Sequence, residues 1–262
     1  MDTFDKLKKA QQKNSSILCV GLDVDINKVP QQFKSVPDGL LEFNKQIIHS
    51  TKDFVCCYKL NFAFYEQYGV EGFELLKKTF ELIPENIVSI ADAKRCDIGN
   101  TMTGYAKSIF DYFNADAVTI NPYLGKDSLD PFLAYKKKMV FLLTLTSNPG
   151  SANFQRIESN GIPLYKHIVK QSLTWSDKNN LGFVVGATQP EDIDQLRAIA
   201  PNNFFLIPGV GTQGGSVEAV VKANANGPAV INVSRAVIYA SKEKDFADKA
   251  REKAIKYKLS FM

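Results

Sequence analysis

The chain has 262 residues, of which 45% are hydrophobic, and 32 basic against 28 acidic residues give a formal net charge of +4. This length suits one α/β barrel domain, and so weak a charge excludes an argument for nucleic-acid binding. We find no signal-peptide pattern and no apolar run approaching about 18 residues, so we expect no membrane span.

An amphipathic segment over 3–13 opens the chain, and we expect residues 1–14 to form a helical extension at the bottom of the fold. Apolar runs predict strands over 17–22, 54–60, 87–91, 116–120, 139–145, 181–186, 204–208 and 228–233. Amphipathic stretches predict helices over 38–52, 68–82, 98–113, 126–137, 161–175, 190–200, 214–225 and 241–257. Eight strand–helix repeats with doubly buried strands predict a closed (β/α)8 TIM barrel, forming a single domain over 1–262. The irregular region 147–161 predicts a functional loop after the fifth strand.

Polar side chains stand at the carboxyl ends of several predicted strands, where the active sites of such barrels are built. The segment ADAKRCDIGNT over 91–101 is the most informative, because Asp92 and Lys94 lie two apart after an apolar run and share one face if the strand continues. We expect Lys59 and Asp97 to extend this pair into a chain of alternating charges, and we take the cluster as the site of chemistry. The other polar strand ends are Asp23, Asn61, Asn121, Thr146, Ser147, Ser234 and Arg235.

A glycine-rich segment, PGVGTQGGS over 208–216, follows the seventh predicted strand. Glycines let the backbone approach an anion closely, and loops after strands seven and eight are the recurrent phosphate site of this fold. Gln213 in the segment and Arg235 after the eighth strand offer hydrogen-bond donors to phosphate oxygens. The spacing matches neither a Walker phosphate loop nor a dinucleotide fingerprint. We therefore predict a small phosphorylated ligand.

The residue types that are scarce narrow the chemistry further. The two histidines, His49 and His167, lie in predicted helices, which disfavours a histidine base or a histidine-rich metal cage. A lysine amid the carboxylates would repel a divalent cation, which argues against a metal there. Three of the four cysteines lie in apolar strand-like runs and none has zinc-like spacing, which favours a reducing compartment. Together with the lack of a signal-peptide pattern, this leads us to expect a cytoplasmic protein. The cysteines are Cys19, Cys56, Cys57 and Cys96.

In this order and spacing, several segments resemble orotidine 5′-phosphate decarboxylase, in particular the branch with a DAKRxDIGNT signature. The segments are LDVD, YKLN, DAKRCDIGNT, SNPG and IPGVGTQGG, with the final strand-end arginine, and they span about residues 15 to 240. The resemblance implies a dimeric (β/α)8 barrel that makes UMP and carbon dioxide from orotidine 5′-monophosphate (OMP) in pyrimidine biosynthesis, without metal or cofactor. It leaves open whether the chain stands alone or was cut from a polypeptide that also carries an orotate phosphoribosyltransferase.

The resemblance also implies a role for each matching residue. Asp92 would lie against the substrate carboxylate, and Lys94 would supply the proton to C6. Asp23 and Lys59 would hold the ribose hydroxyls. In a homodimer, Asp97, Ile98 and Thr101 would reach into the site of the partner subunit. The remaining substrate contacts would be Ser147 at the pyrimidine, Pro208, and, at the phosphate, Gln213 and Arg235 with backbone N–H groups near Gly211 and Ser234.

One position departs from the family signature, which commonly has glycine where this chain has Cys96. A cysteine is costly there if the backbone needs a positive φ, and harmless otherwise. The sequence does not say whether Cys96 is natural or engineered. The spacing of Asp92, Lys94 and Asp97 is intact, so the expected activity stands.

Three alternatives remain beside the decarboxylase. The first is a magnesium-dependent sugar-phosphate aldolase or decarboxylase on the same barrel, although such a site would want a carboxylate where Asn61 and Asn121 follow their strands. The second is a Schiff-base aldolase that uses Lys59 or Lys94. The third is a catalytically inactive nucleotide-binding paralogue.

Overall fold

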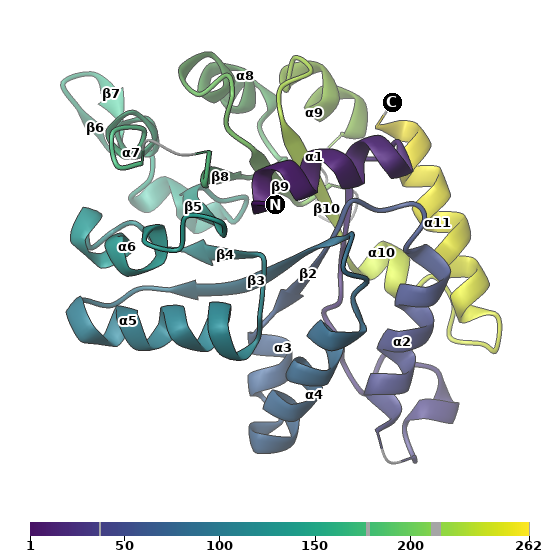
Figure 1. Cartoon of the computed structure of the whole chain (residues 1–262). Helices are drawn as coiled ribbons and strands as arrows, with labels where there is room; N and C mark the ends of the chain where they lie inside the picture. The colour runs from purple at the N-terminus through teal and green to yellow at the C-terminus, as the bar shows by residue number, and fades with distance from the viewer. Residues whose placement is uncertain (37, 177–178, 211–215, 262) are drawn as a thin grey trace.

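A computed structural model describes residues 1–36, 38–176, 179–210 and 216–261. Eight parallel strands close into a barrel in the order β1-β10-β9-β8-β5-β4-β3-β2, and helices surround it (Figure 1). The predicted single-domain (β/α)8 barrel is therefore confirmed. The barrel strands are β1 (Leu18–Gly21), β2 (Cys57–Asn61), β3 (Val88–Arg95), β4 (Ala117–Ile120), β5 (Met139–Leu145), β8 (Leu181–Val185), β9 (Phe205–Pro208) and β10 (Ala229–Val233).

Most of the helices lie within the predicted amphipathic stretches, but the last one runs over Phe246–Ser260 rather than 241–257. Two short helices, Ala63–Glu66 and Arg235–Ile238, were not predicted. None of the helices in the described part of the chain is long and apolar enough to span a bilayer. The α-helices are α1 (Thr3–Asn14), α2 (Gly39–Thr51), α3 (Ala63–Glu66), α4 (Gly69–Leu82), α5 (Gly99–Lys107), α6 (Lys126–Leu133), α7 (Leu164–Ser172), α8 (Pro190–Ile199), α9 (Val217–Ala223), α10 (Arg235–Ile238) and α11 (Phe246–Ser260). The other helical segments are two 3-10 helices, η1 (Gln31–Phe33) and η3 (Pro149–Asn153), and a π-helix, η2 (Ser108–Tyr112).

Helix α1 closes the amino-terminal end of the barrel, where Figure 1 shows it lying across the strands. Asp2 caps the helix by accepting a hydrogen bond from the backbone N–H of Asp5. Leu7 of α1 is fully buried and joins the cluster of side chains inside the barrel. At the rim, Lys6 forms an ion pair of 2.6 Å with Asp116. The amino-terminal extension expected from the sequence therefore plugs the barrel.

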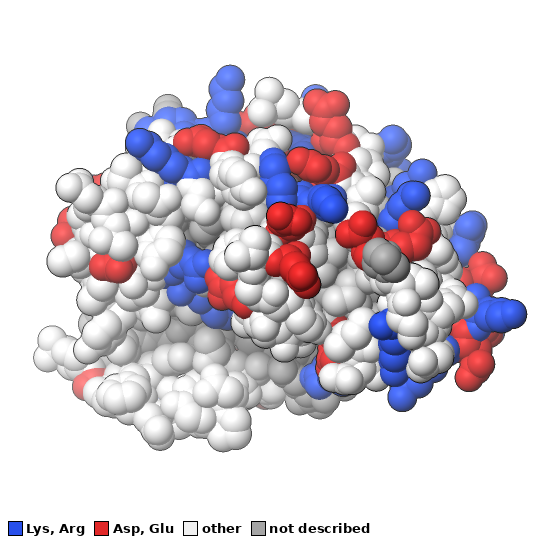
Figure 2. Space-filling view, turned by 90° about the horizontal axis from the view of Figure 1, so that it is seen from below, with Lys and Arg blue, Asp and Glu red and all other residues white. Residues whose placement is uncertain are grey.

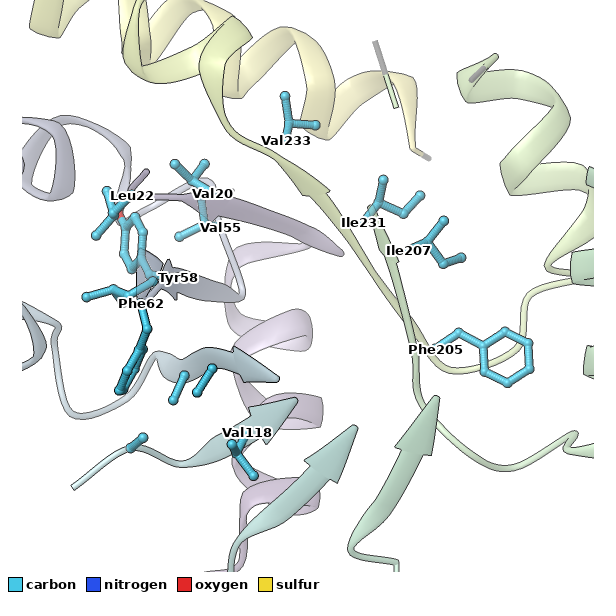
Figure 3. Packing of buried hydrophobic residues seen from close by; sticks show 14 of the residues in the cluster. Val20, Leu22, Val55, Tyr58, Phe62, Val118, Phe205, Ile207, Ile231 and Val233 are labelled. Atoms are coloured by element: carbon cyan, nitrogen blue, oxygen red, sulfur yellow. The ribbon is translucent and has the colours of Figure 1, made fainter. Parts of the chain in front are cut away.

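The strand side chains form two cores because successive residues on a strand point to opposite faces. The outer core includes Val20, Ile207 and Ile231 and packs against the surrounding helices (Figure 3). The inner core fills the barrel. Gly182 is needed there, since an added Cβ would lie 2.7 Å from ring atoms of Phe141. The filled interior leaves the carboxyl ends of the strands as the place for a ligand.

The structure differs from the predicted elements at a few places. β2 begins at Cys57 rather than 54, and β3 continues to Arg95 rather than ending at 91. The region predicted as a loop after the fifth strand contains η3 and begins a short antiparallel hairpin, β6 (Glu158–Ser159) with β7 (Ile162–Pro163). The strand ends depend on pairing with strands that are distant in sequence, and the two-residue strands of the hairpin are too short to show a periodic pattern.

Candidate active site

A cavity of about 330 Å³ opens at the carboxyl ends of the barrel strands. Its floor is formed by inward-facing side chains of five strands, which are Thr119, Leu143, Val184, Leu206 and Asn232. The structure brings eight of the predicted site residues to this one cavity. They are Asp23, Lys59, Asp92, Lys94, Ser147, Pro208, Ser234 and Arg235.

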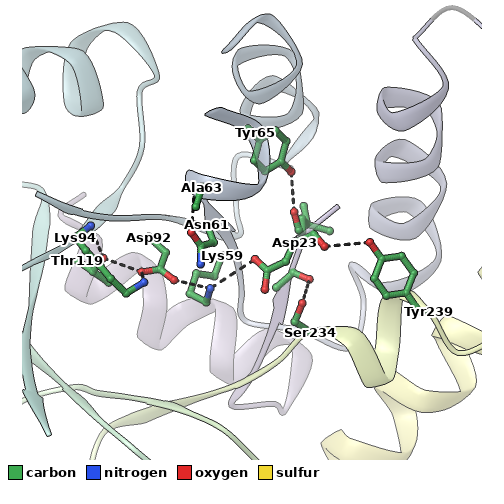
Figure 4. A network of polar contacts seen from close by, with 12 residues as sticks. Asp23, Lys59, Asn61, Ala63, Tyr65, Asp92, Lys94, Thr119, Ser234 and Tyr239 are labelled. Carbon is green, nitrogen blue, oxygen red and sulfur yellow. Dashed lines mark hydrogen bonds and ion pairs between the residues drawn. The ribbon is translucent and has the colours of Figure 1, made fainter. Parts of the chain in front are cut away.

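The carboxylate of Asp92 lies between two lysines (Figure 4). Its Oδ2 accepts a hydrogen bond of 2.8 Å from Lys59 Nζ, and its Oδ1 accepts one from Lys94 Nζ. On its other side Lys59 faces Asp23, with 3.8 Å between Nζ and Oδ1. Lys59 is 4% exposed and Asp92 is 7% exposed. Charges of opposite sign therefore alternate across the bottom of the cavity.

The charges of this row stabilise one another. Burial alone would raise the pKa of Asp92, but the charges and hydrogen bonds of Lys59 and Lys94 outweigh burial and hold that pKa well below its usual range. Burial alone would likewise lower the pKa of Lys59, but the charges of Asp23 and Asp92 raise it above its ordinary value. Lys59 and Asp92 are therefore both charged at neutral pH.

Two tyrosines hold the segment that carries Asp23 (Figure 4). Tyr65 Oη donates to the carbonyl of Leu22 at 2.8 Å, and Tyr239 Oη donates to the carbonyl of Asp23 at 3.0 Å. The side-chain Oδ1 of Asp23 is buried and has no hydrogen-bond partner in the described part of the chain. Since buried acceptors are normally satisfied, this oxygen is suited to accept a hydrogen bond from a ligand.

Lys94 has an unusual backbone conformation. Its φ is 49°, in the left-handed region that non-glycine residues seldom adopt. The register of β3 against β4 shifts at the same point, between Ala91 and Arg95. The Lys94 side chain is 45% exposed although its ammonium contacts Asp92, so it borders both the cavity and solvent. Cys96 does not have a positive φ, so the departure from the family signature imposes no backbone strain there.

Asp97, Ile98 and Thr101 lie at the start of α5 and do not line the cavity of their own chain. Asp97 Oδ1 accepts a hydrogen bond of 2.8 Å from the backbone N–H of Ile98, and no ion pair joins it to Lys94 among the described residues. Within one chain, the prediction that Asp97 continues the row of charges is therefore wrong. Asp97 follows both the left-handed turn at Lys94 and the end of β3 at Arg95, so it does not continue the strand that carries Asp92.

Two of the residues expected near a phosphate lie at the carboxyl end of β10, the strand next to β1. Ser234 and Arg235 line the cavity, and Ser234 Oγ donates to the carbonyl of Gly21 at 3.0 Å. Position 21 must be glycine for this contact, because an added Cβ would lie 2.8 Å from the Cβ of Ser234. Gly211 and Gln213 lie outside the described residues.

Two polar residues of the cavity floor were not singled out in the sequence. Thr119 lies within a predicted strand, and threonine is common in strands, so nothing marked it. Asn232 offered a signal, because asparagine is depleted in strands and here interrupts the apolar run over 228–233. Its buried Oδ1 has no hydrogen-bond partner in the described chain. Neither histidine lines the cavity.

Comparisons with known proteins point to one family. The family model described as orotidine 5′-phosphate decarboxylase / HUMPS matches residues 16–250. The orotidine 5′-phosphate decarboxylase of Flavobacterium johnsoniae is 48% identical over 259 residues, covering 97% of this chain and 95% of that protein. The protein of the same name from Phocaeicola vulgatus is 46% identical over 251 residues, covering 94% and 92%.

Solved structures of similar proteins have the same barrel. The Leishmania donovani OMP decarboxylase aligns with a TM-score of 0.84 at 35% identity, covering 99% of this chain and 100% of that chain. The Leishmania donovani UMP synthase aligns with a TM-score of 0.88 at 36% identity and covers 100% of this chain. This chain corresponds to 57% of the length of that synthase chain.

Proposed function

The chain belongs to the orotidine 5′-phosphate decarboxylase family, and on that premise we propose how its cavity performs the reaction. The reaction of the family is decarboxylation of OMP to UMP in pyrimidine biosynthesis, and the chain is an enzyme of this class, a carboxy-lyase. We propose that Lys94 is the proton donor and that no metal or cofactor takes part. The observation that carries the proposal is the Asp92 carboxylate held between Lys59 and Lys94 in the cavity.

In the proposed mechanism, the bond between C6 and the carboxylate breaks, carbon dioxide leaves, and the electron pair stays on C6. The Lys94 ammonium stabilises this developing negative charge and then gives its proton to C6. Asp92 lies against the substrate carboxylate, and repulsion between the two raises the energy of the bound ground state. Because the Lys94 side chain is 45% exposed, its amine can regain a proton from solvent after each turnover.

Contacts far from C6 are proposed to position the ring. Asp23 and Lys59 hold the ribose hydroxyls, for which the buried Oδ1 of Asp23 provides an acceptor. Binding energy from the remote phosphate raises turnover as well as affinity, so orotidine without its phosphate should react more slowly than OMP even at saturation. The proposed contacts along the rest of the substrate are Ser147, Pro208, Gly211, Gln213, Ser234 and Arg235.

We also propose a homodimer in which Asp97, Ile98 and Thr101 complete the partner's site. These residues do not line their own cavity, and Ile98 is 60% exposed. Two other large side chains, Tyr123 and Phe154, are 81% and 70% exposed on loops after β4 and β5. Charged side chains are sparse at the lower left of Figure 2, on the side where Figure 1 places α5 and α6. An exposed apolar area of this kind suits a second copy of the chain.

Cofactor independence is supported by the kinds of side chain at the site. Asn61 lines the cavity and Asn121 follows β4, where a magnesium site would use carboxylates. Within the described residues, no group of three His, Cys, Asp or Glu side chains is placed to hold a metal ion. The carboxylate of Asp92 already accepts hydrogen bonds from the ammonium groups of Lys59 and Lys94, so it is poorly placed to bind a metal ion.

The test is a spectrophotometric assay of the purified protein with OMP in EDTA. We expect the absorbance of the orotate ring to fall and UMP to form at the same rate with and without EDTA. Activity lost in EDTA and restored by magnesium would favour the magnesium alternative. Inactivation by borohydride only in the presence of substrate would favour a Schiff base. UMP binding without any loss of absorbance would identify an inactive paralogue.

A further inference from the structure

Strand β3 is longer than its neighbour β4 beside the catalytic pair. The register shifts between Ala91 and Arg95, whose partners on β4 are Val118 and Ile120. The residue of β4 between these partners is Thr119, and the residues of β3 opposite it are Asp92, Ala93 and Lys94. Such a bulge redirects side chains and occurs often next to active sites.

The hydroxyl of Thr119 joins both ends of this bulge. Its Oγ1 donates to Asp92 Oδ1 at 2.9 Å and accepts from the backbone N–H of Lys94 at 3.1 Å. Thr119 is 1% exposed and lines the cavity (Figure 4). A hydroxyl has one donor and two acceptor positions, so this single group can serve both contacts at once. An apolar side chain of the same shape would serve neither.

The two contacts act where the backbone is strained. A lysine with φ near 49° persists only if its surroundings hold it there. For Lys94, the holding contacts are the bond from its N–H to Thr119 and the bond from its ammonium to Asp92. Asp92 Oδ1 receives both the Lys94 ammonium and the Thr119 hydroxyl, so all three groups meet at one oxygen.

We propose that Thr119 is a positioning residue whose hydroxyl fixes the Asp92–Lys94 pair in its reactive arrangement. The inference rests on the function proposed above for that pair. Without the hydroxyl, the backbone at Lys94 can relax toward ordinary conformations, and the ammonium no longer occupies one place relative to C6. A displacement of about 1 Å between reacting groups can lower a rate by about 100-fold.

The test compares Thr119→Val, which keeps the shape without the hydroxyl, with Thr119→Ser, which keeps the hydroxyl without the methyl group. We expect Thr119→Val to lower kcat for OMP by about 10-fold to 100-fold. The KM for OMP and the inhibition constant of UMP should stay within about threefold, because ribose and phosphate contacts are untouched. Thr119→Ser should restore most of kcat. If Thr119→Val does not fold, Thr119→Ala is measured with the same expectation.

Three results would overturn this role. They are a wild-type kcat in the hydroxyl-free variant even if its melting temperature falls, an equal loss of kcat in Thr119→Val and Thr119→Ser, and a rise of KM alone. Each can be seen while the wild-type protein decarboxylates OMP normally, so the proposed function would survive. Absence of activity in the wild-type protein would instead remove the proposed function and this role with it.

Discussion

Replacing Asp92 with asparagine keeps the side-chain shape and removes the negative charge between the two lysines. Lys59 Nζ lies 2.8 Å from Asp92 Oδ2 and 3.8 Å from Asp23 Oδ1. With an effective dielectric constant of about 20, these attractions are roughly 6 and 4 kcal/mol. The substitution also removes the cost of desolvating Asp92 but leaves Lys59 buried. We therefore expect the free energy of unfolding to fall by about 3–5 kcal/mol at pH 7, as for other buried ion pairs that lose one partner.

Denaturant unfolding at one fixed protein concentration measures this loss, since dimerisation would make the apparent stability depend on concentration. Asp194→Asn is the matched control. Asp194 is exposed on α8 and has no ion pair within the described residues, so its replacement should change stability by less than about 0.5 kcal/mol. An Asp92→Asn protein as stable as this control would refute the idea that the buried row holds the site together.

The stability gap between wild type and Asp92→Asn should also depend on pH. Burial lowers the pKa of Lys59, but Asp23 and Asp92 raise it overall, so its contribution is complete below the unfolded-state pKa of about 10.4 and lost as pH rises through the folded-state pKa. Without Asp92, the pKa of Lys59 in the folded protein falls, so folded Asp92→Asn loses the Lys59 proton at a lower pH than the folded wild type does. The difference in stability between the two proteins should therefore narrow above about pH 9.

At low pH the gap should narrow for a different reason. The pKa of Asp92 is lowered in the folded wild type, so its contribution is present above the unfolded-state value of about 3.9 and is lost as pH falls through the folded-state pKa. The gap should therefore be widest between about pH 5 and 8. A gap that stays constant from pH 7 to 10 would show that Lys59 does not depend on Asp92 for its charge.

The other predictions concern the proton donor, the dimer and a buried arginine. Lys94→Ala should lower kcat by at least about 1000-fold yet change stability by less than about 1 kcal/mol, because the side chain is 45% exposed; near-normal turnover would exclude it as donor. Mixing Lys94→Ala with Asp97→Ala subunits should restore about a quarter of wild-type activity, because about half of the dimers are mixed and one of the two sites in each mixed dimer is intact. No recovery of activity would contradict a site shared between subunits. Arg197→Lys should lower the free energy of unfolding by about 2–4 kcal/mol without changing the KM for OMP, because the Arg197 guanidinium donates to five acceptors. A melting curve like that of the exposed control Arg251→Lys would contradict this expectation.

The barrel could be predicted because its signals are local, whereas the boundaries that were missed depend on distant partners. The third strand was expected to end at 91, since the charges that follow it resemble a strand end. β3 continues because the carbonyl of Arg95 accepts a hydrogen bond of 3.0 Å from the N–H of Asn121, which lies beyond β4. Because Asn121 is distant from Arg95 in sequence, the residues around β3 alone cannot reveal this contact. The bounds of the domain, residues 1–262, and a cytoplasmic location stay predictions.

For the site, residue type and spacing pointed to the participants but not to the way they meet. Asp92 and Lys94 were expected on one face of a regular strand, yet the strand is irregular and Lys94 reaches Asp92 from a left-handed turn. The sequence raised the question of whether Cys96 has a positive φ, and in the structure the positive φ belongs to Lys94, two residues earlier. Thr119 belongs to another strand, so its link to both residues depends on the register between β3 and β4.

The bulge in β3 suggests how one short segment would contribute to the chain's own cavity and, in the proposed homodimer, to that of the partner. A regular strand would place Asp92, Lys94 and Cys96 in one inward column, and its direction would carry α5 along the barrel wall. The left-handed turn at Lys94 instead returns the ammonium to Asp92, and a second positive φ of 51° at Gly99 starts α5 at once. Asp97 lies between these two turns and does not line its own cavity. The strain at Lys94 therefore separates the residues that serve the chain's own site from those proposed to serve the partner's.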